Sequence, residues 1–447
     1  MTTSNKKQMH LNRRQFLTAS AAVTVAAGAG ISLTSTSAEA VSIKTKAHIV
    51  VVGSGLAGLA MVNRLRKQLD GAKITLLDAK TVHHYQPGFT LIATGIWPVE
   101  KVSDTNQEFI PAGVDWIQEM AREFKPDTNQ VVTDSGRVLN YDYLIVAPGL
   151  QLDFDLIEGM DVSRIGTNGL TSVYPSPDLA LATWKAMEKF CKTGGTALMT
   201  LPNTAIKCAG APLKMTFMLA NRAQQAGTRA NSTIDFHSAI TSVFSVPVIN
   251  QEVLNRWETL NIPVHFNSNL VAVDIDAQRA TFEQEDGTRI QKDYDFLHVA
   301  PPMRAPDSIK NSPLAWQEGS FAGGGWLDVD PGTLQHNRYK NVFGVGDING
   351  TAKGKTAATV KKSVPLVVEN LLSVMTDKEP TQIFDGYTSC PLLVREGAAL
   401  LVEFDYNNNL QPSFPGVIAP LEELWATWII KTVGLRPTYL NMLRGLA

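Results

Sequence analysis

The sequence predicts an α/β fold with two domains, followed by an amphipathic segment near the C-terminal end. Three observations support this prediction: a strand, a glycine-rich turn and a helix follow one another over residues 48–69, apolar strands recur after residue 194, and an apolar stripe lies within 421–429. A chain of 447 residues is long enough for two or three domains. The 40 Lys and Arg residues nearly balance the 42 Asp and Glu residues, so nothing indicates nucleic-acid binding.

Residues 1–40 have the pattern of an export signal. The sequence NRRQFL at 12–17 resembles a twin-arginine motif, an apolar run covers 16–33, and AEA at 38–40 is a small-residue cleavage pattern. The alternative is a retained membrane anchor, but Gly, Ala, Ser and Thr make the run poorly hydrophobic for that role. We expect the mature chain to begin at Val41, after export in the folded state.

A dinucleotide-binding turn is predicted where the first strand ends. The strand at 49–52 is followed by Gly53, Gly55 and Gly58, which form G-x-G-x-x-G at the start of a helix. Such glycines let the backbone approach a pyrophosphate, whose charge is stabilised by the helix N-terminus. A second strand ends in Asp78, twenty residues after Gly58 (78 − 58 = 20), where an acid accepts hydrogen bonds from a ribose. The alternative is an ordinary glycine turn.

The segment 114–139 is expected to form a small antiparallel excursion with a hairpin turn at 134–136. The second domain is predicted to begin with a strand at 194–201, with further strands at 234–237, 264–266 and 296–301. Its first strand leads into 202–212, where prolines replace the required glycine spacing. We therefore predict that this domain has no nicotinamide site.

A second acidic position follows at 341–347, a strand that ends in Gly346-Asp347. An acid at this edge of a parallel sheet can accept hydrogen bonds from a polyol. Lys355 then precedes a helix that is predicted to extend to about Val374, with a kink at Pro365. Lys355 and the helix N-terminus can stabilise negative charge on a reduced cofactor, and the alternative for Lys355 is a solvated surface lysine.

The last predicted helix begins at Pro420 and ends at Gly434. Its apolar stripe consists of Leu421, Leu424, Trp425, Trp428 and Ile429. About thirteen residues reach roughly 20 Å, too short to cross a bilayer. The paired tryptophans favour a position at the membrane interface, and the alternative is packing on the core or in a dimer interface.

The chain contains three cysteines, Cys191, Cys208 and Cys390. An oxidising compartment favours a disulfide, with one thiol left over, but the sequence alone does not choose the pair. The adjacent histidines His83 and His84 belong to the region after the second strand, and no set of metal ligands is recognised around them or elsewhere.

Several motifs together resemble the sulfide:quinone oxidoreductases, in particular the subgroup that includes the mitochondrial enzyme. These motifs are YQPG at 85–88, PNT at 202–204, KCAGAP at 207–212, GD at 346–347, KTAA at 355–358, DGYTSCPL at 385–392 and EFDY at 403–406. The resemblance implies two Rossmann-like domains of the glutathione-reductase type, non-covalent FAD and a membrane-associated C-terminal segment. The implied organisation is a signal at 1–40, FAD-binding parts at 41–150 and 301–376, a second domain at 151–300 and a quinone- and membrane-binding region at 377–447.

The resemblance also implies the chemistry. Cys208 and Cys390 would form a redox-active disulfide that sulfide attacks, with the persulfide on Cys390, while Cys208 attacks the flavin C4a. Lys207 could lower the pKa of Cys208 or be an exposed charge. Sulfite, glutathione or a second sulfide would accept the sulfane sulfur. Electrons would then pass to a membrane quinone near Phe404, Tyr406 or Phe414.

The predicted location is the periplasm, peripheral on the inner membrane, because the twin-arginine pattern departs from the mitochondrial context of the subgroup. Deletion of 420–447 is expected to release the protein from membranes and to leave FAD bound. Three alternatives are a flavocytochrome c sulfide dehydrogenase subunit, a type II NADH:quinone oxidoreductase and a non-enzymatic flavin scaffold. The chain lacks C-x-x-C-H, and the second domain lacks the glycine turn that NADH binding requires.

Overall fold

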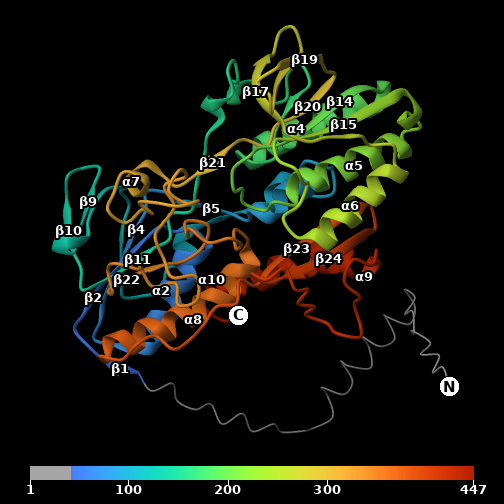
Figure 1. Cartoon of the computed structure of the whole chain (residues 1–447). Coiled ribbons are helices and arrows are strands. Elements are labelled where there is room, and N and C mark those ends of the chain that lie inside the picture. Colours follow the sequence, from blue (N-terminus) through green and yellow to red (C-terminus); the bar gives the residue numbers. More distant parts are fainter. Residues whose placement is uncertain (1–41) are drawn as a thin grey trace, which may run out of the picture. The chain divides into compact units, whose positions relative to one another are not determined.

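Two parallel sheets of five strands organise the part of the chain that the structure describes (Figure 1). This computed structural model describes residues 42–447, so the predicted export signal at 1–40 lies outside it. Residues 42–447 form one compact unit in which helices and strands alternate. The predicted α/β fold is confirmed.

The first sheet combines early and late segments of the chain. Its strand order is β22-β11-β2-β4-β7, and all neighbouring strands are parallel. The strands are β2 (His48–Val52), β4 (Lys73–Leu77), β7 (Val114–Ile117), β11 (Tyr143–Val146) and β22 (Val342–Gly344). Helices α2 (Leu56–Gln68) and α8 (Ala357–Met375) contact each other, and Pro365 lies inside α8.

The expectation of an antiparallel excursion over 114–139 was wrong in part. Residues 114–117 form β7, which pairs in parallel with β4 at the edge of the first sheet. The antiparallel sheet consists instead of β8 (Ala121–Lys125), β9 (Gln130–Thr133) and β10 (Val138–Asn140). A short apolar run does not reveal the direction in which its strand pairs, because that depends on the neighbour it meets.

The second sheet is made of residues 170–298, in the order β13-β20-β14-β15-β16. Its strands are β13 (Leu170–Thr171), β14 (Gly195–Leu201), β15 (Ser232–Ser238), β16 (Val264–His265) and β20 (Phe296–His298), and its helices are α4 (Pro177–Thr193), α5 (Ala211–Gln225) and α6 (Pro247–Thr259). A three-stranded antiparallel sheet follows β16 and consists of β17 (Ser268–Asp274), β18 (Arg279–Gln284) and β19 (Arg289–Asp293). The strands predicted near 194, 234, 264 and 296 are confirmed.

A hairpin of β23 (Thr388–Arg395) and β24 (Ala398–Phe404) contacts α5 and precedes the C-terminal helices. These are α9 (Trp425–Ile429), a π-helical turn η8 (Ile430–Gly434) and α10 (Leu435–Leu443). The remaining short elements are β1 (Ile43–Lys44), β3 (Leu69–Asp70), β5 (Val82–His84), β6 (Ser103–Thr105), β12 (Gln151–Leu152), β21 (Met303–Arg304), α3 (Phe89–Ile92) and α7 (Asp307–Lys310).

The last helix differs from its prediction at both ends. It begins at Trp425 because Leu421 has a φ of +64°, outside the helical region. It does not end at Gly434, whose backbone remains helical, and the wider π turn leads directly into α10. Pro437 lies near the start of α10, directly after the π-helical turn. Among residues 42–447, no helix combines the length and apolarity that crossing a bilayer requires.

Candidate functional site

The glycine-rich turn joins β2 to α2 with the close contacts that its sequence predicts. A Cβ at Gly53, where φ is +105°, would lie 2.2 Å from the carbonyl oxygen of Ala147. A Cβ at Gly58 would lie 1.8 Å from the carbonyl oxygen of Gly53, so both positions require glycine. A Cβ at Gly55 would meet nothing within 4 Å, and no side chain caps α2 there. The turn therefore offers an open face and uncapped N–H groups to a phosphate.

Asp78 lies beside this turn, where the sequence predicts it. Its carboxylate accepts hydrogen bonds from the backbone N–H groups of Ser54, at 2.7 Å, and Lys80, at 2.9 Å. These bonds fix the side chain, and its oxygens keep further lone pairs for a ribose hydroxyl. The turn and Asp78 thus fit the adenosine part of a dinucleotide.

The second acidic position follows β22. Gly346 has a φ of +86°, and the next residue, Asp347, has a pKa raised by burial, with Lys355 opposing that effect. The Lys355 Nζ donates to the carbonyl oxygens of Asp347, at 2.6 Å, and Asn349, at 3.0 Å. It also lies 3.5 Å from the centroid of the Trp326 ring. Burial lowers the Lys355 pKa to about 7, so this lysine can gain a proton when negative charge develops nearby.

The structure brings Cys208 and Cys390 together. Cys208 lies in the loop between β14 and α5, has a φ of +47°, and donates its backbone N–H to the Lys355 carbonyl oxygen at 3.0 Å. Cys390 lies on β23, is buried, and hydrogen-bonds the Cys208 sulfur. A Cβ at Gly210 would lie 2.4 Å from the Cys390 Sγ. Glycine at 210 therefore allows the two cysteine segments to approach.

Two buried lysines surround the cysteine pair. The Nζ of Lys214, on α5, donates to the Cys208 Sγ at 3.3 Å, and the side chain is 2% exposed. Lys431, in the π-helical turn, is also 2% exposed and donates to the Pro87 carbonyl oxygen at 2.6 Å. Burial lowers the Lys431 pKa to about 7, and the positive charge of Lys214 adds to that effect.

These contacts shift the pKa values of the two thiols in opposite directions. The hydrogen bond from Cys390 holds the Cys208 pKa well below its ordinary value, and Lys214 and Lys431 act in the same direction against the effect of burial. The same hydrogen bond, together with burial, raises the pKa of Cys390. Burial alone would lower the Lys214 pKa, but the two sulfurs outweigh it and raise that pKa. These effects favour the thiolate on Cys208 and the neutral thiol on Cys390.

Lys207, adjacent to Cys208 in sequence, has a different environment. Its Nζ donates to Gln86 Oε1 at 2.7 Å, and burial lowers its pKa to about 8. The lysine that bonds the sulfur is Lys214, six residues after Cys208 (214 − 208 = 6), which the sequence analysis missed. One available signal was its place within the apolar run PLKMTFML at 212–219, because lysine is rarely buried unless it is paired. Lys431 was not among the site residues predicted from the sequence.

A cavity of 290 Å³ opens beside Cys390. Its lining includes the loop 202–206, the segments 243–245 and 351–356, and Phe404. The Lys353 Nζ lies at this lining and hydrogen-bonds the Ser245 hydroxyl at 2.8 Å. Cys390 contributes to this lining and is itself 4% exposed.

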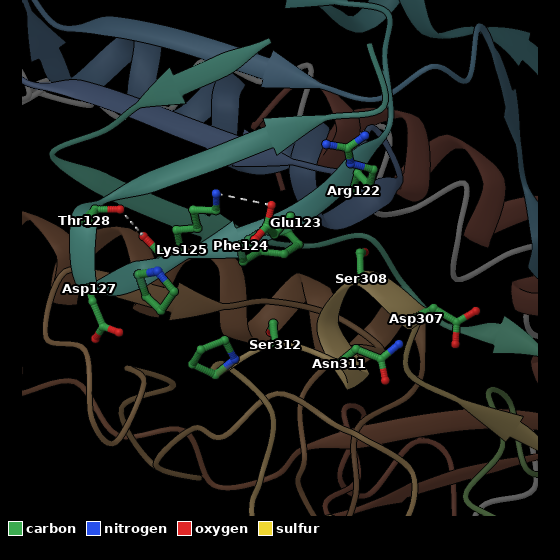
Figure 2. A pocket seen from close by; sticks show the side chains of 12 residues that line it. Arg122, Glu123, Phe124, Lys125, Asp127, Thr128, Asp307, Ser308, Asn311 and Ser312 are labelled. Carbon is green, nitrogen blue, oxygen red and sulfur yellow. Dashed lines mark hydrogen bonds and ion pairs between the residues drawn. The ribbon is translucent and has the colours of Figure 1, made fainter. Parts of the chain in front are cut away.

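A larger cleft of 580 Å³ lies between β8 and α7 (Figure 2). Charged side chains of both signs line it, including Arg122, Lys125 and Asp307, and Lys125 pairs with Glu123 at 3.4 Å. None of the predicted site residues borders this cleft.

The three aromatic residues predicted for the quinone have different environments. Phe404 is buried and lines the cavity of Cys390. Tyr406 donates its hydroxyl to the Pro331 carbonyl oxygen at 3.2 Å, and Phe414 is 45% exposed. Tyr406 and Phe414 do not line the cavity of Cys390, so the three residues do not border one cavity.

Comparisons with known proteins relate this chain to a family and a fold. Residues 47–183 match the family model described as pyridine nucleotide-disulphide oxidoreductase. The mitochondrial sulfide:quinone oxidoreductase of Mus musculus is 35% identical over 82% of this chain and 80% of its own length. The Schizosaccharomyces pombe protein of the same name is 31% identical over 83% of each chain. The crystal structure of the Aquifex aeolicus sulfide:quinone oxidoreductase has a TM-score of 0.71 at 21% identity, over 89% of this chain and 92% of the other, and supports the fold.

The predicted periplasmic location is contradicted by these relatives, both of which are named as mitochondrial proteins. The prediction depended on two arginines before a weakly apolar run. Residues 1–40 contain several basic residues and a single acid, Glu39, and this composition is also typical of mitochondrial transit peptides. The twin-arginine pattern therefore did not discriminate between the two destinations.

Proposed function

The chain belongs to the sulfide:quinone oxidoreductase family, and from this premise we propose how its residues carry out the reaction. The protein is a flavin-dependent enzyme that oxidises sulfide and reduces a quinone. We propose that Cys208 and Cys390 are its sulfide-oxidising pair. The observation that carries this proposal is the placement of Cys390 against the Cys208–Gly210 segment, beside Lys214, whose Nζ donates to the Cys208 Sγ at 3.3 Å.

The cofactor is proposed to be non-covalent FAD. The open face at Gly55, the close contacts of Gly53 and Gly58, and the fixed carboxylate of Asp78 support binding of the pyrophosphate and ribose. Gly346, Asp347 and Lys355 are proposed to hold the part of FAD that carries the ring. When bound, the flavin accepts two electrons from the sulfur centre and passes them to the quinone.

The sulfur chemistry is proposed to begin from a Cys208–Cys390 disulfide. Hydrosulfide attacks the Cys390 sulfur, the disulfide bond breaks, and the products are a persulfide on Cys390 and a thiolate on Cys208. The bond from Lys214 stabilises that thiolate. An acceptor then takes the outer sulfur, and the disulfide forms again as two electrons leave the pair.

Sulfide and the sulfur acceptor are proposed to enter through the cavity beside Cys390. Sulfite, glutathione and a second sulfide are the candidate acceptors, and all of them carry negative charge near neutral pH. Lys353 at the lining favours such anions. Phe404 lines the same cavity. It is proposed to form part of the wall on the sulfur side of the site and not to contact the quinone.

The membrane surface is proposed to contact the C-terminal region, where large apolar side chains are exposed. Val417 and Val433 are 66% and 61% exposed, and Phe414 belongs to the same loop as Val417. We propose that the quinone enters near this loop. The variant Val417→Asp/Val433→Asp should lose binding to liposomes in a flotation assay, because charged side chains disfavour an apolar interface.

Val138→Asp is the matched control, since Val138 is 49% exposed on β10 in another part of the structure. Equal flotation of the double variant and this control would show that another surface contacts the membrane.

The function is tested by anaerobic titration of the purified protein. Sulfide should bleach the flavin absorbance in a stoichiometric reaction, and a soluble quinone should restore it. Recovery with a haem protein but not with a quinone would overturn the proposed electron acceptor. Bleaching of a Cys208→Ser variant at the parent rate would overturn the proposed cysteine pair.

A further inference from the structure

A second group of polar side chains lies in the other half of the molecule, at the edge of the second sheet. Asp235 and His237 are two residues apart on β15, so both side chains project from the same face of the strand. His265, on β16, is the register partner of His237. The imidazole rings of His237 and His265 are stacked, with centroids 4.5 Å apart. Neighbouring parallel strands thus place one acid and two histidines together.

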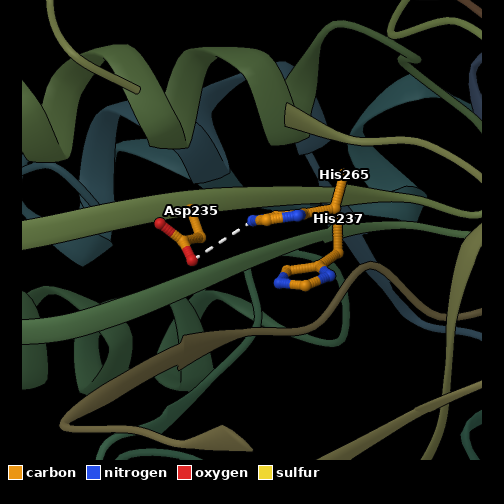
Figure 3. A group of neighbouring side chains, drawn as sticks. All are labelled: Asp235, His237 and His265. Carbon is orange, nitrogen blue, oxygen red and sulfur yellow. Dashed lines mark hydrogen bonds and ion pairs between the residues drawn. The ribbon is translucent and has the colours of Figure 1, made fainter. Parts of the chain in front are cut away.

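The ligand atoms of the three side chains converge (Figure 3). His265 Nε2 and Asp235 Oδ2 are 3.3 Å apart, and one ligand atom from each of the three residues lies within 4.8 Å of the others. Zinc bonds to nitrogen and oxygen are about 2.0–2.2 Å long, so two ligands of a tetrahedral zinc ion are about 3.4 Å apart. The histidine and the acid already have that separation, and His237 must turn out of its stack with His265 to direct its nitrogen at the same ion.

Two buried atoms in this group have no hydrogen-bond partner within residues 42–447: His237 Nε2 and Asp235 Oδ1. His237 is 2% exposed and Asp235 is 8% exposed, so water does not readily replace the missing partners. The other ring nitrogen of His237 bonds the Ser268 hydroxyl at 2.8 Å, and the Gln284 amide donates to that hydroxyl at 3.0 Å. A histidine held through one nitrogen presents the other to a metal ion.

A cation already lies at this place. The Lys292 Nζ is 3.0 Å from Asp235 Oδ2 and 3.5 Å from His265 Nε2. Lys292 belongs to β19, its side chain is 29% exposed, and its stem is flexible enough to move toward solvent. The ammonium group therefore occupies a site that attracts cations, but it leaves His237 Nε2 and Asp235 Oδ1 unpaired.

We propose that Asp235, His237 and His265 form a zinc site, with Lys292 displaced toward solvent when Zn²⁺ binds. Nitrogen and carboxylate ligands suit Zn²⁺, and three protein ligands leave a fourth position for water. Ser268 on β17 orients His237, while Lys292 comes from β19. The metal thus cross-links β15 and β16 at the edge of the second parallel sheet.

The three residues do not form a local motif, so the sequence alone does not reveal this group of ligands. Asp235 and His237 are close in sequence, but His265 follows 28 residues after His237 (265 − 237 = 28). Only the pairing of β15 with β16 brings them together.

The test is a Zn²⁺ titration of the flavin-loaded protein in competition with a chromogenic chelator. The parent should bind Zn²⁺ at this site, and Asp235→Asn should lose that binding. Lys292→Met should bind Zn²⁺ about tenfold more tightly or better, because the competing positive charge is gone. Arg289→Met is the matched control: it removes a positive charge from the same strand but outside the cluster, and its affinity should equal that of the parent.

Two further measurements separate this site from the cysteines and from misfolding. X-ray absorption of the Zn²⁺ complex should show nitrogen and oxygen ligands at about 2.0–2.2 Å and no sulfur ligand at about 2.3 Å. Zn²⁺ should raise the melting temperature of Lys292→Met more than that of Arg289→Met. The proposal is overturned if Lys292→Met binds Zn²⁺ no more tightly than Arg289→Met, if Asp235→Asn retains the parent's affinity, or if the bound zinc has sulfur ligands.

Discussion

The negative charge of Cys208 depends on side chains from three separate elements. Cys390 comes from β23, Lys214 from α5 and Lys431 from the π-helical turn. Each of them favours the thiolate form of Cys208, and together they outweigh the effect of burial. Cys208 is therefore suited to be the nucleophilic sulfur, while the raised pKa of Cys390 keeps that residue protonated when the disulfide is reduced.

This asymmetry predicts different outcomes for the three cysteines. Cys208→Ser should slow flavin reduction by sulfide by about a hundredfold or more, because no thiolate remains. Cys390→Ser should be similarly severe, through loss of the disulfide that sulfide attacks. Cys191 lies near the end of α4, and burial raises its pKa to about 11, so Cys191→Ser should retain most of the turnover. Stopped-flow absorbance measures each rate after the flavin content has been compared.

Lys214 predicts a change in pH dependence. The thiolate is the reactive form of Cys208, and loss of the nearby positive charge raises the pKa of that thiol. In the parent, that pKa lies well below its usual value, so the rate of flavin reduction should change little with Cys208 ionisation near neutral pH. In Lys214→Met, the same rate should fall about tenfold between pH 8.5 and pH 6, because the thiolate becomes protonated as the pH decreases.

The control for this measurement is Lys189→Met, an exposed lysine on α4. Its profile should match that of the parent. If the rate of flavin reduction in Lys214→Met decreases between pH 8.5 and pH 6 no more than in the control, Lys214 does not set the charge of Cys208.

Among the single residues of the site, the cysteine pair was predicted from the sequence only through the family resemblance. It pointed to Lys207, the neighbour of Cys208 in the chain, whereas Lys214 makes the contact because α5 turns it toward the sulfur. Lys431 is 223 residues beyond Cys208 (431 − 208 = 223), and no pattern near either residue indicates that they interact. Electrostatic partners of this kind depend on tertiary packing.

Among the elements, the C-terminal helix α10 is an integral part of the first half of the structure. The Asn63 side chain, on α2, donates to the Leu443 carbonyl oxygen at 2.9 Å. His83 bonds the Tyr439 hydroxyl at 2.8 Å, and Arg436 reaches both carboxylate oxygens of Asp104 at 3.0 Å. The helix thus stabilises α2, which begins at the glycine-rich turn.

These contacts change the outcome expected for truncation. Deletion of 435–447 should lower both the flavin occupancy and the melting temperature, because Asn63 and His83 each lose one hydrogen-bond partner and α2 loses the helix packed against it. This differs from the expectation from sequence that deletion of 420–447 leaves FAD bound. Flavin absorbance per protein and thermal unfolding measure the two effects.

Tyr439→Phe tests the same element without removing it. Loss of the bond to His83 should destabilise the protein by about 1 kcal/mol, and Tyr143→Phe, a partly exposed tyrosine of β11, is the control. Full flavin occupancy and an unchanged melting temperature in the truncated protein would contradict this role for α10.

Elements with a strong local sequence pattern were predicted correctly. Elements whose bounds depend on tertiary packing were not. The strand–turn–helix at 48–68 and the strand at 195–201 agree with their apolar runs and flanking glycines. The last helix extends past Gly434 because α10 packs against α2, which outweighs the helix-ending tendency of glycine and proline. Local patterns do not contain that information.

At the scale of the whole molecule, the two parallel sheets differ in the segments that follow β2 and β14. The first has a glycine-rich turn after β2, whereas β14 of the second leads into the loop that contains Cys208. That loop begins with Pro202, is followed by Pro212 in the first turn of α5, and lines the cavity of Cys390, at the position where a nicotinamide domain has its glycine turn.

NADH and NADPH should therefore reduce the flavin at least about a hundredfold more slowly than sulfide does, because the second half lacks the turn that binds their pyrophosphate. Anaerobic mixing with each donor, followed by flavin absorbance, gives the comparison. Rapid bleaching by either nucleotide would mean that the loop 202–212 binds a dinucleotide in spite of its prolines.

The first sheet contains strands from early and late parts of the chain, and this affects the order in which the two sheets can fold during translation. Once a ribosome has released the chain up to residue 298, every strand of the second sheet is available, but the first sheet still lacks β22. The later half can thus reach its native packing while the earlier half waits for β22, α8 and α10. The glycine-rich turn is synthesised before any strand of the second sheet, and its surroundings are completed only after α10 has been synthesised.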